Sequence, residues 1–279
     1  MNRPQTIQIF LPDGSPRSVK IAEITNRVVK AVLLPRNKIE YISSRDELKN
    51  VGVFLFGETD EQVKPSVYIG EAEDCLERIK QHNRNKEFWN YAVIMVSKIN
   101  AFTKSHAKYL EHIAVQQAKE SNRYQTENIS VPTKPFITES MEADLLDSFD
   151  TIKILLSTLG FPVFDKISKD TIKKREILII NGRNIHAEGD LIDEGFVVFK
   201  GSQVKKETTP SCHEYLINIR KKLIENRILK ETKGDYVFQQ DYIFNSPSTA
   251  GGVVLGRSTN GWTKWKNENG QSLDELKRK

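Results

Sequence analysis

Residues 5–35 have the sequence pattern of three β-strands: apolar and polar residues alternate from Thr6, and two further strand-like runs follow at residues 18–25 and 27–35. After the first run, Asp13-Gly14 supplies the chemistry of a hairpin turn. Residues 45–50 predict a short helical turn. We therefore expect residues 1–50 to form a β-rich N-terminal extension with a hairpin.

The next region, residues 51–135, combines strand patterns with two helix patterns. Strands are expected at residues 52–57, 66–70 and 91–98. The first helix pattern has apolar residues at i, i+3, i+4 and i+7, namely Ala72, Cys75, Leu76 and Ile79. The second helix begins after Thr103, a suitable N-cap, and its apolar stripe comprises Ala107, Leu110, Ala114 and Ala118. These patterns predict an α+β fold.

Two polar residues stand where packing alone would not place them. At 100° per residue, Glu111 lies inside the apolar stripe of the second helix, about 40° from Ala107. An unpaired buried carboxylate is very costly, so Glu111 needs a cationic partner or a metal ion. On the first helix, Arg78 shares one flank with Glu71, Cys75 and His82. A salt bridge between Arg78 and Glu111 and a functional site both explain this pattern.

The order of these features resembles the GIY-YIG nuclease superfamily. The residues that carry the resemblance are Gly52-Val53-Phe54 at the first motif, Tyr68-Ile69-Gly70 at the second, Arg78 and His82 in the following helix, Glu111 in the next helix, and Asn128. A lone Y-I-G would carry no information, whereas six features in this order are fairly specific. The resemblance implies a three-stranded antiparallel sheet flanked by helices.

The resemblance also implies roles for these residues. Glu111 would hold one Mg²⁺ or Mn²⁺, Tyr68 would act as general base, and Arg78 would stabilise the scissile phosphate. His82 would contact a phosphate or the base, or else cap its helix. Asn128 would orient Glu111 or a metal-bound water, or else serve ordinary loop chemistry. Phe54 replaces the tyrosine of the first motif, so one phenolic hydroxyl is missing.

Two proline residues in the segment 127–136 predict an extended exit from this domain. A helix is expected at residues 139–160, with Leu145, Phe149, Ile152, Leu156 and Leu159 at heptad-like spacing. It would pack between two domains or form a dimeric coiled coil. Residues 136–174 are therefore expected to be a linker helix followed by a basic linker.

Strand patterns return at residue 175 and predict a smaller α+β domain over residues 175–279. Asn181-Gly182 and Asn260-Gly261 predict turns, and Ser246 followed by Pro247 predicts a helix start. A helix is expected at 211–230, with Tyr215, Leu216, Ile219 and Leu223 apolar and Arg220 on another face. This end of the chain resembles the small uncharacterised domain often found C-terminal to GIY-YIG domains.

The aromatic and basic residues near the C-terminus have two interpretations. Trp262 and Trp265 alternate with Lys264 and Lys266, as in a stacking platform for single-stranded nucleic acid. They also suit the core of a domain that has few other large residues. The remaining histidines show no zinc-like pairing and receive no role: His106, His112, His186 and His213.

Composition changes this picture little. The chain is 38% hydrophobic and 28% charged, as in ordinary globular proteins, and its net charge of +5 is compatible with nucleic acid. No apolar run is long enough to span a membrane, and no signal-peptide pattern follows Met1. Cys75 and Cys212 fit neither a metal site nor a disulfide framework, so we expect a cytoplasmic protein.

We expect a metal-dependent endonuclease that hydrolyses DNA phosphodiester bonds, in duplex or branched DNA. Candidate phosphate contacts are Lys80, Arg84, Lys86, Lys173, Lys174 and Arg175. The last three lie in the basic linker, which is alternatively only a solvated charge run. Phe54 supports a second hypothesis, a DNA-binding or protein-interaction module without activity. The DNA structure, the pathway and the oligomeric state are left open by the sequence.

Overall fold

The computed structural model describes residues 4–57, 65–85, 88–165, 177–182, 185–192, 195–232 and 234–278. The chain divides into two compact units, Met1–Lys166 and Ile167–Lys279. Each unit contains both helices and sheets, so the expected α+β class is confirmed. The segments expected as an N-terminal extension, a nuclease-like domain and a linker helix all fall in the first unit.

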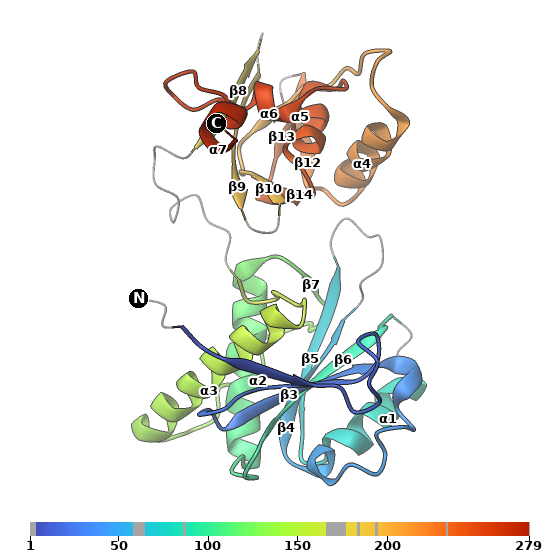
Figure 1. Cartoon of the computed structure of the whole chain (residues 1–279), viewed down its shortest axis with the longest axis vertical. Coiled ribbons are helices and arrows are strands. Elements are labelled where there is room, and N and C mark those ends of the chain that lie inside the picture. The colour runs from blue at the N-terminus through green and yellow to red at the C-terminus, as the bar shows by residue number, and fades with distance from the viewer. Residues whose placement is uncertain are drawn as a thin grey trace. The chain divides into compact units, whose positions relative to one another are not determined.

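The described strands of the first unit form one sheet (Figure 1). They are β1 (Ile7–Phe10), β2 (Lys20–Ile24), β3 (Val29–Pro35), β4 (Gly52–Gly57), β5 (Ser66–Ala72), β6 (Tyr91–Ser97) and β7 (Gln125–Thr126). Their order across the sheet is β1-β2-β3-β6-β4-β5-β7. Neighbours are antiparallel except β5 and β7, which run parallel.

The N-terminal hairpin is therefore an integral part of this sheet. Strand β3 pairs with β6 along its whole length, from Val29 opposite Ser97 to Pro35 opposite Tyr91. The three strands expected around β4 are adjacent and antiparallel, but they lie within a seven-stranded sheet of the described residues. The N-terminal extension is β-rich, as expected, and its strands join this sheet; the sequence does not show that pairing, because strand pairing between distant segments leaves no local pattern.

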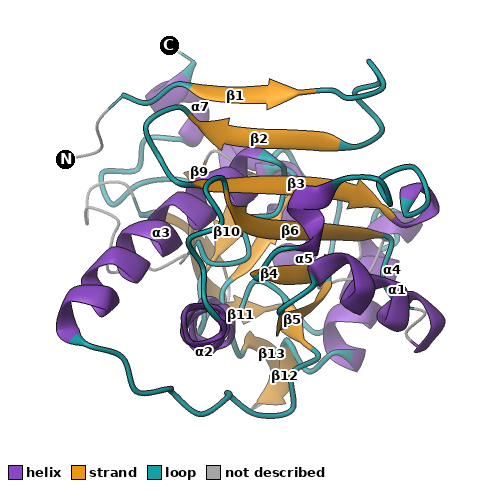
Figure 2. Ribbon diagram, turned by 90° about the horizontal axis from the view of Figure 1, so that it is seen from below, coloured by secondary structure: helices purple, strands orange, loops and turns teal. Residues whose placement is uncertain are grey.

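Helices cover both faces of the sheet (Figure 2). Helix α1 (Cys75–Asn85) lies on one face, while α2 (Lys104–Ser121) and α3 (Glu139–Thr158) lie on the other. Strand alternation sends Val67 and Ile69 into the core beneath α2 and α3, and it sends Phe54 into the core beneath α1. Thr103 caps α2 as expected, because its side chain accepts the backbone N–H of His106.

Helix α3 is part of the first unit. Its heptad-like residues, including Phe149, Ile152 and Leu156, are buried in the same core as the strands. The helix contacts β2 and β3, so its apolar stripe is already covered by the sheet. The spacing of its apolar residues correctly predicted a helix with one buried face. That face is covered by the sheet of the same unit, and not by a second domain or by another helix in a coiled coil.

The second unit contains two small sheets and four helices in its described part. The strands are β8 (Leu178–Gly182), β9 (Ile185–Ile192), β10 (Gly195–Val198), β11 (Gln203–Val204), β12 (Leu229–Thr232), β13 (Asp235–Phe238) and β14 (Tyr242–Phe244). The helices are α4 (Glu214–Glu225), α5 (Pro247–Leu255), α6 (Gly261–Lys264) and α7 (Leu273–Lys277). The sheet orders are β14-β10-β9-β8 and β11-β13-β12.

Local turn and cap signals in this unit have mixed outcomes. Ser246 caps α5 with Pro247 in its first turn, as predicted. Asn181-Gly182 is not a turn, because both residues belong to β8 and Gly182 pairs with Ile185 across the hairpin. Asn260-Gly261 is not a turn either: Asn260 caps α6 by accepting the backbone N–H of Trp262 at 3.0 Å. A Cβ on Gly261 would meet the Pro247 carbonyl at 2.1 Å, which only glycine avoids.

The two tryptophans differ in their surroundings. Trp265 is fully buried, donates from its indole N–H to the Pro247 carbonyl at 3.0 Å, and packs 4.5 Å from the ring of Phe196. This confirms the core interpretation for Trp265. Trp262 is half-buried beneath the Arg278 guanidinium, 3.5 Å from its ring centre. The two tryptophan rings therefore do not form a stacking platform together.

Helix α4 is shorter than expected and buries a charged residue. Tyr215 is 59% exposed, whereas Arg220 is buried beside Leu216 and Leu223. The Arg220 guanidinium donates to the carbonyl oxygens of Val253, Lys205 and Lys206. The placement of Arg220 on an outer face was therefore wrong, because hydrogen bonds to backbone carbonyls compensate for its burial.

Two further expectations concern membranes and cysteines. Among the described residues, no helix is both long and apolar enough to cross a membrane. Cys75 and Cys212 are both buried and form no disulfide. Burial raises the pKa of the Cys75 thiol to about 12, so this residue belongs to the core beneath α1 rather than to a reactive site.

Candidate functional site

The candidate site lies where the edge of β5 becomes free. Strand β7 pairs with β5 only at Ser66 and Val67. The Asn128 side chain then continues the pairing: its Oδ1 accepts the N–H of Ile69 at 3.0 Å, and its Nδ2 donates to the Ile69 carbonyl at 2.8 Å. Beyond Ile69, no described strand pairs with this side of β5. Side chains from both faces of the sheet can therefore meet around its edge.

Tyr68 points to the face covered by α1, opposite to its neighbours Val67 and Ile69. Its ring centre lies 6.4 Å from that of Phe54 and 5.4 Å from that of His82. Phe54 and Tyr68 therefore lie side by side on the neighbouring strands β4 and β5. Phe54 is fully buried, whereas Tyr68 is only half-buried. The Tyr68 ring is therefore the more accessible of the two.

Arg78 and Glu111 reach Tyr68 from two different helices. Burial raises the pKa of the Tyr68 phenol above its usual value. The hydrogen-bonded guanidinium of Arg78, on α1, lowers that pKa, and the charge of Glu111, on α2, raises it. The Tyr68 phenol is therefore exposed to the charges of both Arg78 and Glu111.

Glu111 is a half-buried carboxylate with a perturbed pKa. Burial and the nearby charge of Glu71 raise the pKa of Glu111 to about 7, against smaller opposite effects of Lys108 and Arg78. No direct ion pair joins Glu111 to Arg78, although both residues are described; Arg78 donates to Gln81 at 3.2 Å. The salt-bridge alternative for Arg78 and Glu111 is therefore wrong.

Glu71 is a site residue that the sequence analysis placed only on a helix flank. It is the penultimate residue of β5 and lies on the same strand face as Ile69, toward α2. Its backbone contributes a hydrogen bond that lowers the pKa of Glu111, while its carboxylate raises that pKa. The signal that identifies Glu71 is strand alternation: residues 67, 69 and 71 all face the helix that carries Glu111.

The carboxylates of Glu111 and Glu71 suit a hard divalent cation. The part of the chain that the structure describes contains no group of three His, Cys, Asp or Glu residues placed to hold a metal ion. Mg²⁺ requires less, because it keeps several water ligands and takes substrate phosphates as others. A divalent cation would also offset the mutual repulsion of two half-buried carboxylates. The residues present therefore fit an ion held mainly by Glu111.

An open groove of about 390 Å³ adjoins this edge. Its lining includes Glu71, Glu77, Arg78, Gln81 and Lys104. Lys104 forms an ion pair with Glu73 at 3.1 Å across the groove. Arg78 and Lys104 therefore stand as cations on a groove whose other charged lining residues are acidic.

The remaining predicted site residues are distributed differently. His82 is buried on the inner side of α1, with its ring 5.6 Å from Phe54. The Asn128 amide is engaged with Ile69, so this residue positions β5. Lys80 is half-buried and Arg84 exposed on α1. Lys86, Lys173, Lys174 and Arg175 lie outside the described residues.

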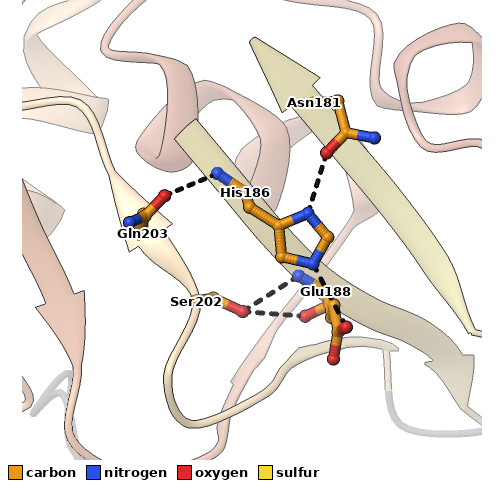
Figure 3. A network of polar contacts seen from close by, with 5 residues as sticks. All are labelled: Asn181, His186, Glu188, Ser202 and Gln203. Atoms are coloured by element: carbon orange, nitrogen blue, oxygen red, sulfur yellow. Dashed lines mark hydrogen bonds and ion pairs between the residues drawn. The ribbon is translucent and has the colours of Figure 1, made fainter. Parts of the chain in front are cut away.

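A second polar cluster occurs in the second unit (Figure 3). The His186 ring contacts the Asn181 side-chain oxygen at 2.8 Å and a Glu188 carboxylate oxygen at 3.2 Å. Ser202 lies nearby, but its hydroxyl bonds to the backbone N–H and carbonyl of Glu188. The Ser202 hydroxyl therefore links the backbone of β9 to the segment that leads into β11. It is not placed as a nucleophile that His186 could activate.

Comparisons with known proteins concern only the second unit. Residues 178–277 match the model of a protein family described as a domain of unknown function, DUF4357. No significant match is found among curated proteins or among solved structures. The matched range coincides with the two small sheets and four helices described above, which identifies them as one domain.

Proposed function

We propose that the first unit is a metal-dependent endonuclease of the GIY-YIG type that hydrolyses DNA phosphodiester bonds. The observation that carries this proposal is the convergence of Tyr68, Arg78 and Glu111 at one free sheet edge. They come from a strand and two helices on opposite faces of the sheet. Strands β6, β4 and β5 are antiparallel neighbours, which agrees with the three-stranded antiparallel sheet that the resemblance implies.

Each residue has a chemical role suited to its surroundings. Glu111 would hold a Mg²⁺ or Mn²⁺ ion, which when bound offsets negative charge on the phosphate and the leaving oxygen. Arg78 presents an exposed guanidinium fork that pairs with phosphate oxygens. Tyr68 would accept a proton from the attacking water as a phenolate. Burial raises the pKa of its phenol, and the adjacent Arg78 guanidinium offsets part of that rise.

The position of Phe54 helps to decide between a DNA-cleaving unit and one that only binds DNA. Its ring is fully buried beside Tyr68 and His82, so it supports the wall of the site. A missing hydroxyl at this position removes one hydrogen bond and leaves Tyr68, Arg78 and Glu111 in place. We therefore infer a slow enzyme rather than an inactive one. Loss of all activity would favour the binding module.

The test compares binding with cleavage in three proteins. Wild type, Tyr68→Phe and Arg78→Lys are each incubated with end-labelled DNA in Mn²⁺, and affinity is measured separately in EDTA. Tyr68→Phe should bind like wild type and fail to cut. Arg78→Lys keeps the charge but loses the fork, so cleavage should fall more than affinity. Equal cleavage by all three proteins would refute the assignment.

A further inference from the structure

The segment that follows β7 carries two nearly bare apolar side chains. We call residues 127–138, which lead from β7 to α3, the strap. Within it, Ile129 is fully exposed and Phe136 is 93% exposed, more than any other large apolar residue in the described part of the chain. Single exposed apolar residues are ordinary on loops. These two require an explanation because of how the strap is held.

The strap is anchored at four points along its length. Asn128 pairs with Ile69 beside the site, and Lys119 donates to the Ile129 carbonyl at 3.3 Å. His112 donates from Nδ1 to the Pro132 carbonyl at 2.6 Å. Lys134 forms an ion pair with Glu142 at 2.8 Å. Ile129 and Phe136 are therefore displayed by a fixed backbone.

These anchors also set the direction of the strap. Its partners on α2 run backwards along the helix, from Lys119 to His112 and then to Tyr109, whose ring lies 5.5 Å from the Lys134 amine. These contacts show that the strap runs back along α2, from its C-terminal toward its N-terminal half. It passes on the side of the helix away from the sheet (Figure 2). Ten residues of helix correspond to about 15 Å. Ile129 lies next to the free edge of β5, and Phe136 lies farther from that edge, toward the N-terminal half of α2.

Helix α2 and the strap carry a small excess of cations. Between residues 101 and 138, the cations are Lys104, Lys108, Lys119, Arg123 and Lys134, and the anions are Glu111, Glu120 and Glu127. Two of these cations are ion-paired with residues outside this range, Lys104 with Glu73 and Lys134 with Glu142. Apolar side chains flanked by cations are how proteins contact DNA whose bases are unstacked: the cations meet phosphates, and the apolar groups insert at a base step or stack on a base.

We propose that the strap binds unstacked bases of the DNA substrate, with Ile129 at a base step beside the site and Phe136 against a base farther along the strand. This inference rests on the proposed function and specifies its substrate class. The preferred DNA has unpaired or frayed bases beside the scissile phosphate, as at a branch. Continuous duplex keeps its bases stacked and gains nothing from either side chain.

The test measures the affinity of full-length Ile129→Ser and Phe136→Ala for two DNAs in EDTA. One is a Y-shaped branched duplex, and the other is a continuous duplex of the same sequence. The matched controls are Ile9→Ser and Phe10→Ala, which alter residues 45% and 60% exposed on β1, at the opposite edge of the sheet. Stacking on an aromatic residue corresponds to about five- to hundred-fold in affinity.

The expected result on branched DNA is a loss of this size for Phe136→Ala and a measurable loss for Ile129→Ser, with continuous duplex bound within about two-fold and both controls unchanged. Equal loss on both DNAs, or no loss, would overturn the proposal. So would a lower unfolding temperature of the strap variants, because it would show that the side chains pack within the protein or against another copy.

Cleavage in Mn²⁺ separates this proposal from the proposed function. If wild type binds branched DNA through the strap but cuts nothing, the endonuclease fails and the strap proposal stands. If wild type cuts DNA but the strap variants keep its preference for branched DNA, the strap proposal fails and the endonuclease stands. If wild type neither binds nor cuts DNA, both are wrong.

Discussion

Replacing Gly70 by alanine tests the packing that supports the candidate site. Gly70 lies opposite Phe54 on the neighbouring strand. A Cβ at Gly70 would meet the Cζ and Cε2 atoms of Phe54 at 2.6 and 2.9 Å and the Cε1 atom of Tyr68 at 3.2 Å. The fully buried Phe54 ring has little space to retreat. The added methyl group must therefore displace Phe54, Tyr68 or the strand itself.

The expected cost follows from this overlap. Extra methyl groups in a well-packed core cost about 1–3 kcal/mol. For a unit of this size, each kcal/mol lowers the unfolding temperature by about 2–4 °C. Displacement of Tyr68 by about 1 Å should also slow cleavage by about 100-fold. Gly70→Ala should therefore be both less stable and much less active than wild type.

A double-mutant cycle shows whether the clash with Phe54 is the cause. Phe54→Leu removes the two colliding ring atoms, so Gly70→Ala should cost less in that background, with a coupling energy of about 0.5–3 kcal/mol by urea denaturation. Gly57→Ala is the matched control on the same sheet, because its Cβ would lie 3.6 Å from the Phe161 ring, an ordinary contact. Additive costs within about 0.5 kcal/mol would refute the packing argument.

Three further predictions concern single residues. Phe54→Tyr should raise the cleavage rate about ten- to hundred-fold, because the added hydroxyl can form a hydrogen bond to a charged group, which is worth about 1.5–3 kcal/mol. An unchanged rate would show that the ring at position 54 does not contribute to cleavage. The pKa of Glu111 is raised from 4.5 to about 7 in the folded state, so the stability of the metal-free protein should fall as pH rises from about 4.5 to about 7 and then level off. Glu111→Gln should not show that fall in stability, and it should be more stable than wild type at pH 8 in EDTA. If the stability of both proteins changes with pH in the same way, this prediction is wrong. Arg220→Met should lower the free energy of unfolding by about 2–5 kcal/mol, measured by thermal unfolding, because buried backbone carbonyls lose their hydrogen-bond donor. Lys221 is exposed, so Lys221→Met should lower it by almost nothing.

Local features of the fold are predictable because they depend on neighbouring residues. The capping of α2 by Thr103 and of α5 by Ser246 follows from one side chain and the backbone within the next turn. Strand alternation places Phe54 and Tyr68 on one face. What alternation cannot provide is the partner of each strand. The pairing of β3 with β6 joins residues that are 56 to 68 positions apart in the sequence.

Polar residues on buried faces are the second source of error. Arg220 falls one helical turn from Leu216 and near Leu223, so its position on the buried face of α4 is readable from spacing. Its charge led to the opposite assignment, since the carbonyls that receive its hydrogen bonds come from distant segments. The same reasoning applies to Glu71, whose strand face was readable but whose neighbour Glu111 comes from another element.

The most direct test of the proposed site is the nicking of supercoiled plasmid in Mn²⁺ by wild type, Glu111→Gln and Glu120→Gln. Both variants replace a carboxylate on α2, but Glu120 is exposed and lies far along the helix from Glu111. Circular dichroism establishes that all three proteins are folded. The account predicts nicking by wild type and Glu120→Gln and none by Glu111→Gln. Nicking at the wild-type rate by folded Glu111→Gln would contradict it.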